Sequence, residues 1–430
     1  MSGFGGVVRV SRTHRLVVAV SVTGLLATAC GGTGGGGQRA ASVGQEAGTP
    51  GTPVAGQAAE RVAAAVLPDS ASPSPSQSPS PSPSASPSPS AQASGPGPAP
   101  LASIGPGERM VRVLALNGYV EWGGTDPKVS WVGEFEKTTG CKVSLKSYDP
   151  SRDDGAGVPA PSSFDVISAP PEVAGRLIAE RKAAPLNTAL LPGYGEIPKR
   201  LRESSAEDGR VYGVPYLWGL NEVLYDSSEV EPDGADAIFE DEGPVMFRDS
   251  PLSLADAALV LRDRGARIKD PFKLTPDQLD AAAELFDKPD KRVFWSDPID
   301  VVKGFATGSV RLAQATPYHR DVLSRGDRPV RAVGDRPVTG WVDSWLVSAQ
   351  AAHPSCAYRW LTWTSSADVQ RQASAWTGFA PANPSACTGR ARRVCVDYRV
   401  GEPGAFKGVY FAVRPADYDQ WIARWSQVAG

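Results

Sequence analysis

The sequence predicts an α/β fold in which parallel sheets are flanked by helices. Between Met110 and Gly430, short apolar runs alternate with amphipathic helical segments, which is the pattern of sheets covered by helices on both faces. This stretch is also long enough to form two domains, each with its own hydrophobic core. Ligands of such folds bind beyond the carboxyl ends of the strands. We therefore expect any binding site to lie in the loops that follow the strands.

The expected strands are short and mostly apolar: 111–116, 142–145, 164–168, an extended aromatic run at 211–216, 312–315 and the residues around Val347. The first expected helix spans 128–138, where Trp131, Val132 and Phe135 recur at helical spacing. Gly140 is placed to end it. Further helices are expected at 173–181, 252–264 and 276–286, and the last two begin with an acidic first turn or a capping residue.

The N-terminus has the features of an export signal. Arg9, Arg12 and Arg15 precede an apolar stretch at 16–28, which is too short to span a bilayer and fits a signal peptide covering 1–29. The run Leu26-Ala27-Thr28-Ala29-Cys30 resembles the lipobox of bacterial lipoproteins, in which the cysteine is lipidated and becomes the first mature residue. An ordinary signal peptide with Cys30 buried later is the alternative, but the tract that follows offers no core. We expect a lipid anchor on Cys30 that holds the protein on the outer side of the cell membrane, facing the extracellular or periplasmic space.

Residues 30–107 are expected to form a disordered linker. The tract opens with Gly-rich sequence and continues with repeated Ser-Pro dipeptides between Ser72 and Ser90, a composition that buries too little apolar surface to fold. Its prolines favour extended conformations. A spacer through the envelope and a merely solubilising tract both fit this composition, and O-glycosylation stays open.

Charge and residue inventory argue against nucleic-acid binding and catalysis. The net charge of −3 becomes −6 once residues 1–29, with three arginines and no acids, are removed, and no basic stripe is present. His14 leaves with the signal peptide, and His319 and His353 are too few for a usual zinc site. The sequence has no nucleophile elbow, phosphate loop or dinucleotide fingerprint. We expect a protein that is not an enzyme and has no cofactor or metal, with His319 facing solvent.

Four cysteines remain if Cys30 is lipidated, and an even number in an exported protein favours disulfides. Cys387 and Cys395 lie in one Gly/Arg-rich segment and are expected to close it. Cys141 and Cys356 would then link distant segments, which requires both to belong to one lobe. Free buried cysteines are the alternative.

Several segments resemble the extracellular solute-binding proteins of the spermidine/putrescine importer family. The most specific is Tyr212-Gly213-Val214-Pro215-Tyr216-Leu217-Trp218-Gly219. The others are 118–121, 135–143, Phe164-Asp165-Val166-Ile167-Ser168, Gly340-Trp341-Val342-Asp343-Ser344 and 356–363. The resemblance covers nearly all of 110–430 and is greatest to a subgroup of polyamine binders that shares the four cysteines.

This resemblance implies a two-lobed periplasmic-binding-protein-like fold of type II. Each lobe would hold a mostly parallel sheet, and two or three hinge crossings would join the lobes. We expect lobe 1 to comprise 110–224 with 341–380, and lobe 2 to comprise 226–338 with 398–430. Such lobes close around a ligand, and a membrane permease recognises the closed form. A monomer is the usual state in this family.

The resemblance also carries over candidate ligand-binding residues. Asp343 matches an amine-binding aspartate, Trp341 forms a wall beside it, and Tyr119 matches a pocket tyrosine. Other positions depart from the family pattern: Leu116 and Thr316 replace tryptophans, and Phe379 replaces a tyrosine. Ser250 and Ser253 stand where the family usually has two amine-binding acids. Glu172 falls near a family tyrosine and would restore one carboxylate, and Asp249 would supply another if the alignment shifts by one residue. Each has a structural alternative: core packing for the aromatics, capping for Asp343 and a helix-dipole interaction for Glu172.

The implied function is the binding subunit of an ABC importer for a small cationic amine such as spermidine or putrescine. A carboxylate beside each ammonium and aromatic walls along the methylenes would provide the affinity. The departures above leave two alternatives open. One is a neutral or zwitterionic ligand such as an amino-acid derivative, and the other is an envelope lipoprotein that has lost its pocket.

Overall fold

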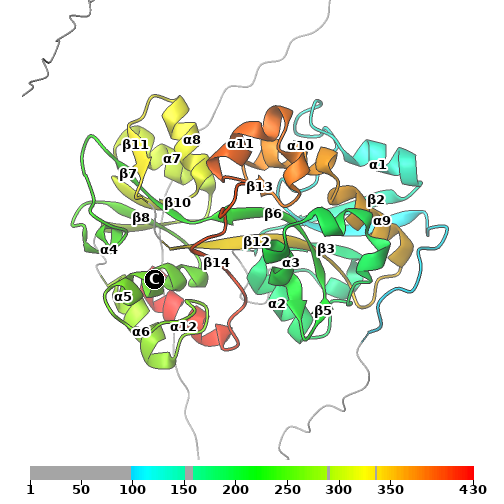
Figure 1. Ribbon diagram of the computed structural model, residues 1–430, viewed down its shortest axis with the longest axis horizontal. Coiled ribbons are helices and arrows are strands. Elements are labelled where there is room, and N and C mark those ends of the chain that lie inside the picture. Colours follow the sequence, from blue (N-terminus) through cyan, green and yellow to red (C-terminus); the bar gives the residue numbers. More distant parts are fainter. Residues whose placement is uncertain (1–97, 151–157, 288–290, 335–336) are drawn as a thin grey trace, which may run out of the picture. The chain divides into compact units, whose positions relative to one another are not determined.

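The computed structural model describes residues 98–150, 158–287, 291–334 and 337–430 (Figure 1). The expected signal peptide, the lipidation at Cys30 and the linker up to residue 97 lie outside the described residues. None of the helices among the described residues is both long enough and apolar enough to cross a membrane.

The first sheet has the strand order β13-β6-β12-β3-β1-β2. Its strands are β1 (Met110–Leu116), β2 (Lys142–Tyr148), β3 (Val166–Ala169), β6 (Gly213–Leu220), β12 (Val338–Val347) and β13 (Ala380–Pro381). β1 pairs in parallel with β2 and β3, whereas β12 runs antiparallel to β3 and β6. Every residue of β3 is buried, as expected for a strand covered by helices on both faces.

The helices on this sheet come from both halves of the chain (Figure 1). They are α1 (Val132–Thr139), α2 (Pro171–Ala179), α3 (Lys199–Arg202), α9 (Pro354–Thr364), α10 (Ala367–Thr377) and α11 (Arg392–Asp397). α1 begins four residues later than the sequence pattern indicated and ends, as expected, at Gly140 in the left-handed conformation with φ 71°. A two-stranded sheet of β4 (Ala206–Glu207) and β5 (Arg210–Val211) precedes β6.

The second sheet has the order β11-β7-β10-β8-β9. Its strands are β7 (Glu222–Asp226), β8 (Val245–Arg248), β9 (Arg292–Trp295), β10 (Leu312–Ala315) and β11 (Val330–Ala332). Its helices are α4 (Ala237–Glu240), α5 (Leu254–Asp263), α6 (Pro276–Glu284), α7 (Pro298–Thr307), α8 (Pro317–Arg325) and α12 (Tyr418–Ala429). β8 is parallel to β9 and β10, and β7 is antiparallel to β10 and β11.

Three segments pass between the two sheets. β6 continues into β7 through Asn221, β12 begins beside the second sheet and ends inside the first, and β14 (Val409–Phe411) pairs in parallel with the start of β12 before the chain reaches α12. Both sheets are mixed, because β6 and β7 are antiparallel to their neighbours and β12 is antiparallel to β3 and β6. The mostly parallel pairing expected from the sequence is therefore limited to the strands away from the crossings.

Each sheet is at the centre of a separate hydrophobic core, so the described residues form two lobes. Tyr398, Val409 and Phe411 pack in the core of the first sheet, whereas Tyr418 and Trp421 pack in the core of the second. We propose on this basis that the third crossing changes lobes just after Phe411, so that residues 398–411 belong to lobe 1 and the residues after 411 belong to lobe 2. The closing of these lobes by hinge motion stays a prediction.

Two disulfides lie in lobe 1. Cys141–Cys356 joins the start of β2 to α9 with a Cα–Cα distance of 5.9 Å, and Cys387–Cys395 closes the segment that leads into α11. The end of the expected linker is also fixed here: Gly105 N–H donates to Ser355 Oγ at 3.1 Å, and the Arg359 guanidinium donates to the Gly105 carbonyl at 2.8 Å. The ordered fold therefore begins before Met110.

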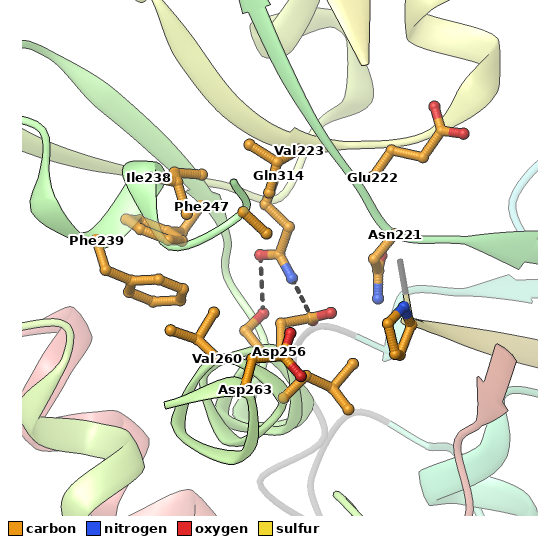
Figure 2. Close-up of a pocket in the computed structure, with 14 residues that line it drawn as sticks. Asn221, Glu222, Val223, Ile238, Phe239, Phe247, Asp256, Val260, Asp263 and Gln314 are labelled. Atoms are coloured by element: carbon orange, nitrogen blue, oxygen red, sulfur yellow. Dashed lines mark hydrogen bonds between the residues drawn. The ribbon is translucent and has the colours of Figure 1, made fainter. Parts of the chain in front are cut away.

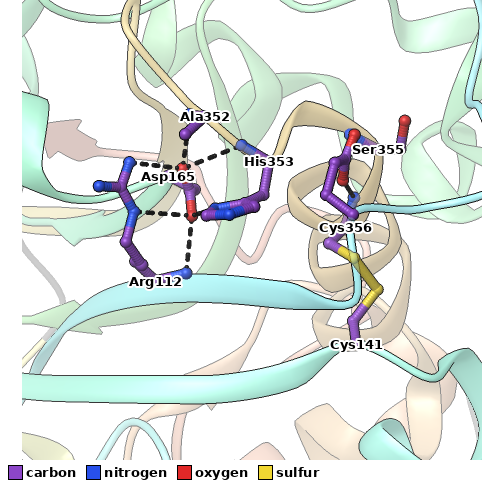
Figure 3. A network of polar contacts seen from close by, with 8 residues as sticks. Arg112, Cys141, Asp165, Ala352, His353, Ser355 and Cys356 are labelled. Carbon is purple, nitrogen blue, oxygen red and sulfur yellow. Dashed lines mark hydrogen bonds and ion pairs between the residues drawn. A yellow bond between two sulfur atoms is a disulfide. The ribbon is translucent and has the colours of Figure 1, made fainter.

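Asp165 joins β1, β3 and the start of α9 in one polar network (Figure 3). Its carboxylate accepts from Arg112 Nη2 at 2.9 Å, from the Ala352 N–H at 2.8 Å and from His353 Nδ1 at 2.7 Å, and the side chain is fully buried. Burial alone would raise the pKa of Asp165, but the bonds from Arg112 and His353 outweigh it and hold the pKa below its usual value. The network is structural, because it lies at the opposite ends of β1 and β3 from the loops expected to bind ligand.

Candidate ligand-binding site

A cavity lies between the two lobes, beyond the carboxyl ends of β3 and β8. Lobe 1 contributes Glu172 in the first turn of α2. Lobe 2 contributes Arg248 at the end of β8, and Ser250 and Ser253 from the segment between β8 and α5. The remaining lining comes from Pro170, Pro171, Asn221, Leu252, Phe272, Thr339, Gly340, Trp341 and Ala412. The cavity is thus built where three crossing segments meet the loops that follow the parallel strands.

Trp341 forms one wall of this cavity. Its indole lies so close to the backbone of Gly219 that a Cβ at residue 219 would be 2.2 Å from the Trp341 ring. Phe379 meets the same indole edge to face, with a centroid distance of 5.5 Å. From lobe 2, the Arg248 guanidinium lies over the ring, 4.8 Å from its centroid.

Asp343 lies behind Trp341 and is buried. The Tyr119 hydroxyl and Trp341 Nε1, at 3.2 Å, both donate to its Oδ2. Burial raises the pKa of Asp343 to about 7, with a further increase from the negative charge of Glu172, while the hydrogen bonds and Arg248 act in the opposite direction. The structure therefore brings Tyr119, Glu172, Trp341, Asp343 and Phe379 together, but of these five residues Glu172 and Trp341 line the cavity, whereas Tyr119, Asp343 and Phe379 lie outside its lining.

Ser250 and Ser253 line the cavity but use their hydroxyls locally. Ser250 Oγ accepts from the Leu252 N–H at 3.3 Å, and Ser253 Oγ donates to the Arg248 carbonyl at 2.9 Å. Asp249 turns away from the cavity, since its Oδ1 accepts from Trp425 Nε1 at 2.7 Å. The structure thus gives no support to Asp249 as a second carboxylate of the site.

Thr316 caps α8 and is not among the lining residues. Its N–H donates to His319 Nδ1 at 3.1 Å, which leaves Nε2–H to donate to the Pro298 carbonyl at 3.0 Å and makes His319 the neutral Nε2–H tautomer. Our expectation that His319 faces solvent was wrong, because only 2% of it is exposed. Burial lowers its pKa to about 4.

Arg248 is the charged lining residue that the sequence analysis missed. Its backbone N–H donates to Gln314 Oε1 at 2.9 Å, and its side chain points back to Trp341. A signal was present: the run Val245-Met246-Phe247 is a buried strand, and the charged residue that ends it stands where ligand-binding loops begin.

A second, more apolar pocket lies within lobe 2 between α5, β7 and β10 (Figure 2). Gln314 Nε2 donates to Asp256 there at 2.6 Å, and Asp256 also accepts from the Thr339 hydroxyl at 2.7 Å. Thr339 in turn accepts from Asn221 Nδ2 at 2.7 Å. This chain of bonds connects the loop of Arg248 to two of the crossing segments. Within the described ranges, no group of His, Cys, Asp and Glu side chains is arranged to hold a metal ion.

Comparison with known families agrees with this architecture. Residues 130–390 match the bacterial extracellular solute-binding proteins. The chain belongs to this family. A putrescine/agmatine-binding protein of Pseudomonas aeruginosa is 22% identical over 277 residues, which are 59% of this chain and 74% of that protein. These solute-binding proteins are non-enzymatic components of transport systems.

Solved structures show the same fold at low identity. A spermidine/putrescine ABC transporter protein from Listeria monocytogenes superimposes with a TM-score of 0.57 at 15% identity, covering 75% of this chain and 98% of that one. A GABA receptor superimposes with a TM-score of 0.58 at 16% identity, covering 74% and 98%. The two-lobed solute-binding fold expected from the sequence is therefore confirmed.

Proposed function

We propose that this solute-binding protein is an exported, Cys30-anchored lipoprotein that captures a small amine-bearing solute between its lobes and delivers it to the permease of an ABC importer. The observation that carries the proposal is the cavity between the lobes, where Glu172 and the wall of Trp341 lie together. A carboxylate stabilises an ammonium group, and an indole face attracts both the cation and its methylenes. Both attractions increase when closure of the lobes removes water.

Asp343 supports the same assignment, because it is a second carboxyl group close to the cavity. It lies next to the wall that the solute would contact, and it is held by Tyr119 and Trp341. Movement of the Trp341 indole would expose this carboxylate to an ammonium group. The candidate site is thus Glu172, Trp341 and Asp343, with Tyr119 and Phe379 as support.

The family also supports the rest of the proposal. Its members deliver solutes to membrane permeases, and the named relatives include binders of putrescine and agmatine. A lipid anchor on Cys30, which the lipobox-like run indicates, would precede the long Ser/Pro-rich tract and would leave the folded lobes free to reach the permease. A monomer suffices for this role.

Thermal unfolding of the full chain tests the proposal. Spermidine, 1,4-diaminobutane, agmatine, 4-aminobutyrate and a panel of amino acids would be added singly, since a ligand at about 100 times its Kd stabilises the folded state by about 2.7 kcal/mol. Glu172→Gln should reduce the stabilisation, whereas Glu134→Gln, on the exposed side of α1, should not. An unchanged melting temperature with every amine would contradict the proposal and favour an envelope lipoprotein without a solute.

A further inference from the structure

We propose that the solute carries a carboxylate as well as an amine, and that the guanidinium of Arg248 binds this carboxylate. The inference rests on the proposed function and narrows it. An ω-amino acid would then lie across the cavity, with its amine towards Glu172 in lobe 1 and its carboxylate towards Arg248 in lobe 2.

The charged residues that line the cavity are arranged as such a solute requires, with an acid in lobe 1 and a base in lobe 2. Among the described lining residues, Glu172 and Arg248 are the charged ones, and they come from opposite lobes. The other polar groups, from Asn221, Thr339 and the two serines, are neutral. A cavity with one acid and one base on facing walls matches a ligand with both charges and does not match one with two positive ends.

The Arg248 guanidinium is positioned but not neutralised. It stacks on Trp341 with 4.8 Å between the guanidinium carbon and the ring centroid. Arg248 donates a hydrogen bond from its backbone N–H, and within the described residues no protein group accepts from the guanidinium. Leaving these donors unpaired in a half-buried site is costly, and a carboxylate that accepts two parallel N–H bonds is the group that fits their geometry.

Neighbouring carboxylates do not serve as that acceptor. Asp249, the next residue, binds Trp425 on the far side of the loop. Asp343 lies behind the Trp341 indole, and its Oδ2 accepts from Tyr119 and Trp341. The partner of the guanidinium is therefore expected to arrive with the solute.

This arrangement discriminates between two solutes of nearly equal length. The diamine 1,4-diaminobutane would place its second ammonium against Arg248, and the two like charges would repel in a cleft that excludes water. Replacing that ammonium by a carboxylate gives 5-aminopentanoate, which changes repulsion into a charge-assisted pair. 4-Aminobutyrate tests the same chemistry with one methylene fewer.

Isothermal titration of the full chain with these three solutes tests the inference. The wild type should bind at least one of the amino acids and bind the diamine at least tenfold more weakly. Arg248→Gln should bind the amino acids at least about 30-fold more weakly than the wild type does. Its preference for the amino acids over the diamine should also be smaller than that of the wild type. The matched control Arg331→Gln, an exposed arginine on β11 of the same lobe, should bind as the wild type does.

The outcomes separate this inference from the function on which it rests. Tighter binding of 1,4-diaminobutane than of both amino acids would overturn the inference and leave the amine importer standing. Absence of binding by all three solutes would overturn the inference, whereas the amine importer would be overturned only if spermidine, agmatine and the amino-acid panel also left the melting temperature unchanged. Amino-acid binding that Arg248→Gln leaves unchanged would overturn the role of Arg248. If Arg248→Gln does not fold, Arg248→Lys keeps the charge but not the paired donors, and it should also lose affinity.

Discussion

The guanidinium carbon of Arg248 lies 4.8 Å from the centroid of the Trp341 ring, so a cation from lobe 2 lies over one face of the aromatic wall carried by β12. Behind that wall, Asp343 accepts from Trp341 Nε1 at 3.2 Å. One indole therefore separates the Arg248 guanidinium from the Asp343 carboxyl group and contacts both. The position of this ring controls which charge a solute meets, and two of the predictions below depend on it.

Gly219→Ala should displace Trp341. A Cβ at residue 219 would lie 2.2 Å from the indole, and the ring cannot move without disturbing its contacts to Phe379 and Asp343. We expect a loss of about 1–3 kcal/mol in the free energy of unfolding, measured in urea, together with weaker binding of whichever solute the titrations identify. Gly133→Ala is the control, because a Cβ there meets open space on α1. Equal stability of the two variants would show that Trp341 is not held by this contact.

Asp343 should make the stability of the unliganded protein depend on pH. Its pKa rises from 3.8 to about 7 on folding, chiefly because of burial, so the folded state binds this proton more tightly than the unfolded state. The stabilising contribution of Asp343 to the free energy of unfolding is therefore complete below pH 3.8 and decreases as the pH rises towards 7. Above pH 7 it is lost, and the free energy no longer changes through this group. At 1.36 kcal/mol per unit, the full change is roughly 4 kcal/mol.

Asp343→Asn should remove this dependence. The asparagine carbonyl can accept the same two bonds from Tyr119 and Trp341 without a titrating charge. Urea unfolding at a series of pH values from 4 to 8 should show a difference between wild type and variant that changes steadily up to pH 7 and stays constant above it. A difference independent of pH would mean that Asp343 titrates normally in the folded protein.

Much of the fold could be predicted because its signals are local. The strand at 312–315 is observed with the same bounds, and the first strand begins only one residue early. The site was expected in the loops after the strands, and Glu172 and the two serines line the cavity from the residues that follow β3 and β8, whereas Trp341 lines it from within β12. Burial of apolar runs and glycine at a helix end depend on a few neighbouring residues, so these features can be read from the sequence.

The remaining features depend on contacts between distant residues. The Arg248 side chain is positioned by its contact with Trp341, and Asp249 is held away from the site by its hydrogen bond from Trp425 near the C-terminus. His319 is buried because Thr316 and Pro298 satisfy both of its ring nitrogens. The antiparallel crossings likewise arise from the connections between lobes. No local pattern in the sequence specifies these partners.

Asp165→Ala should destabilise lobe 1 strongly. Removing this buried carboxylate leaves Arg112 and the N–H groups before α9 without their acceptor, and breaking a buried ion pair costs about 3–5 kcal/mol. Because the pKa of Asp165 is lowered in the folded state, its contribution is fully present at neutral pH and is lost only as acid protonates it. Asp233→Asn, an exposed acid on lobe 2, is the control. A melting temperature within a degree or so of the wild type in Asp165→Ala would contradict a structural role for the network.

The two disulfides should differ in what they contribute to stability. Cys141 and Cys356 are 215 residues apart in sequence, whereas Cys387 and Cys395 are 8 apart. A cross-link that closes a longer loop removes more entropy from the unfolded chain, by about 5 kcal/mol for the first and about 2.5 kcal/mol for the second. The double variants Cys141→Ser/Cys356→Ser and Cys387→Ser/Cys395→Ser should therefore lower the free energy of unfolding in that order. Urea titration of both variants beside the oxidised wild type measures the difference directly. Equal losses, or a greater loss from the short loop, would show that native packing around the sulfur atoms, rather than the length of the closed loop, sets the contribution of each bond.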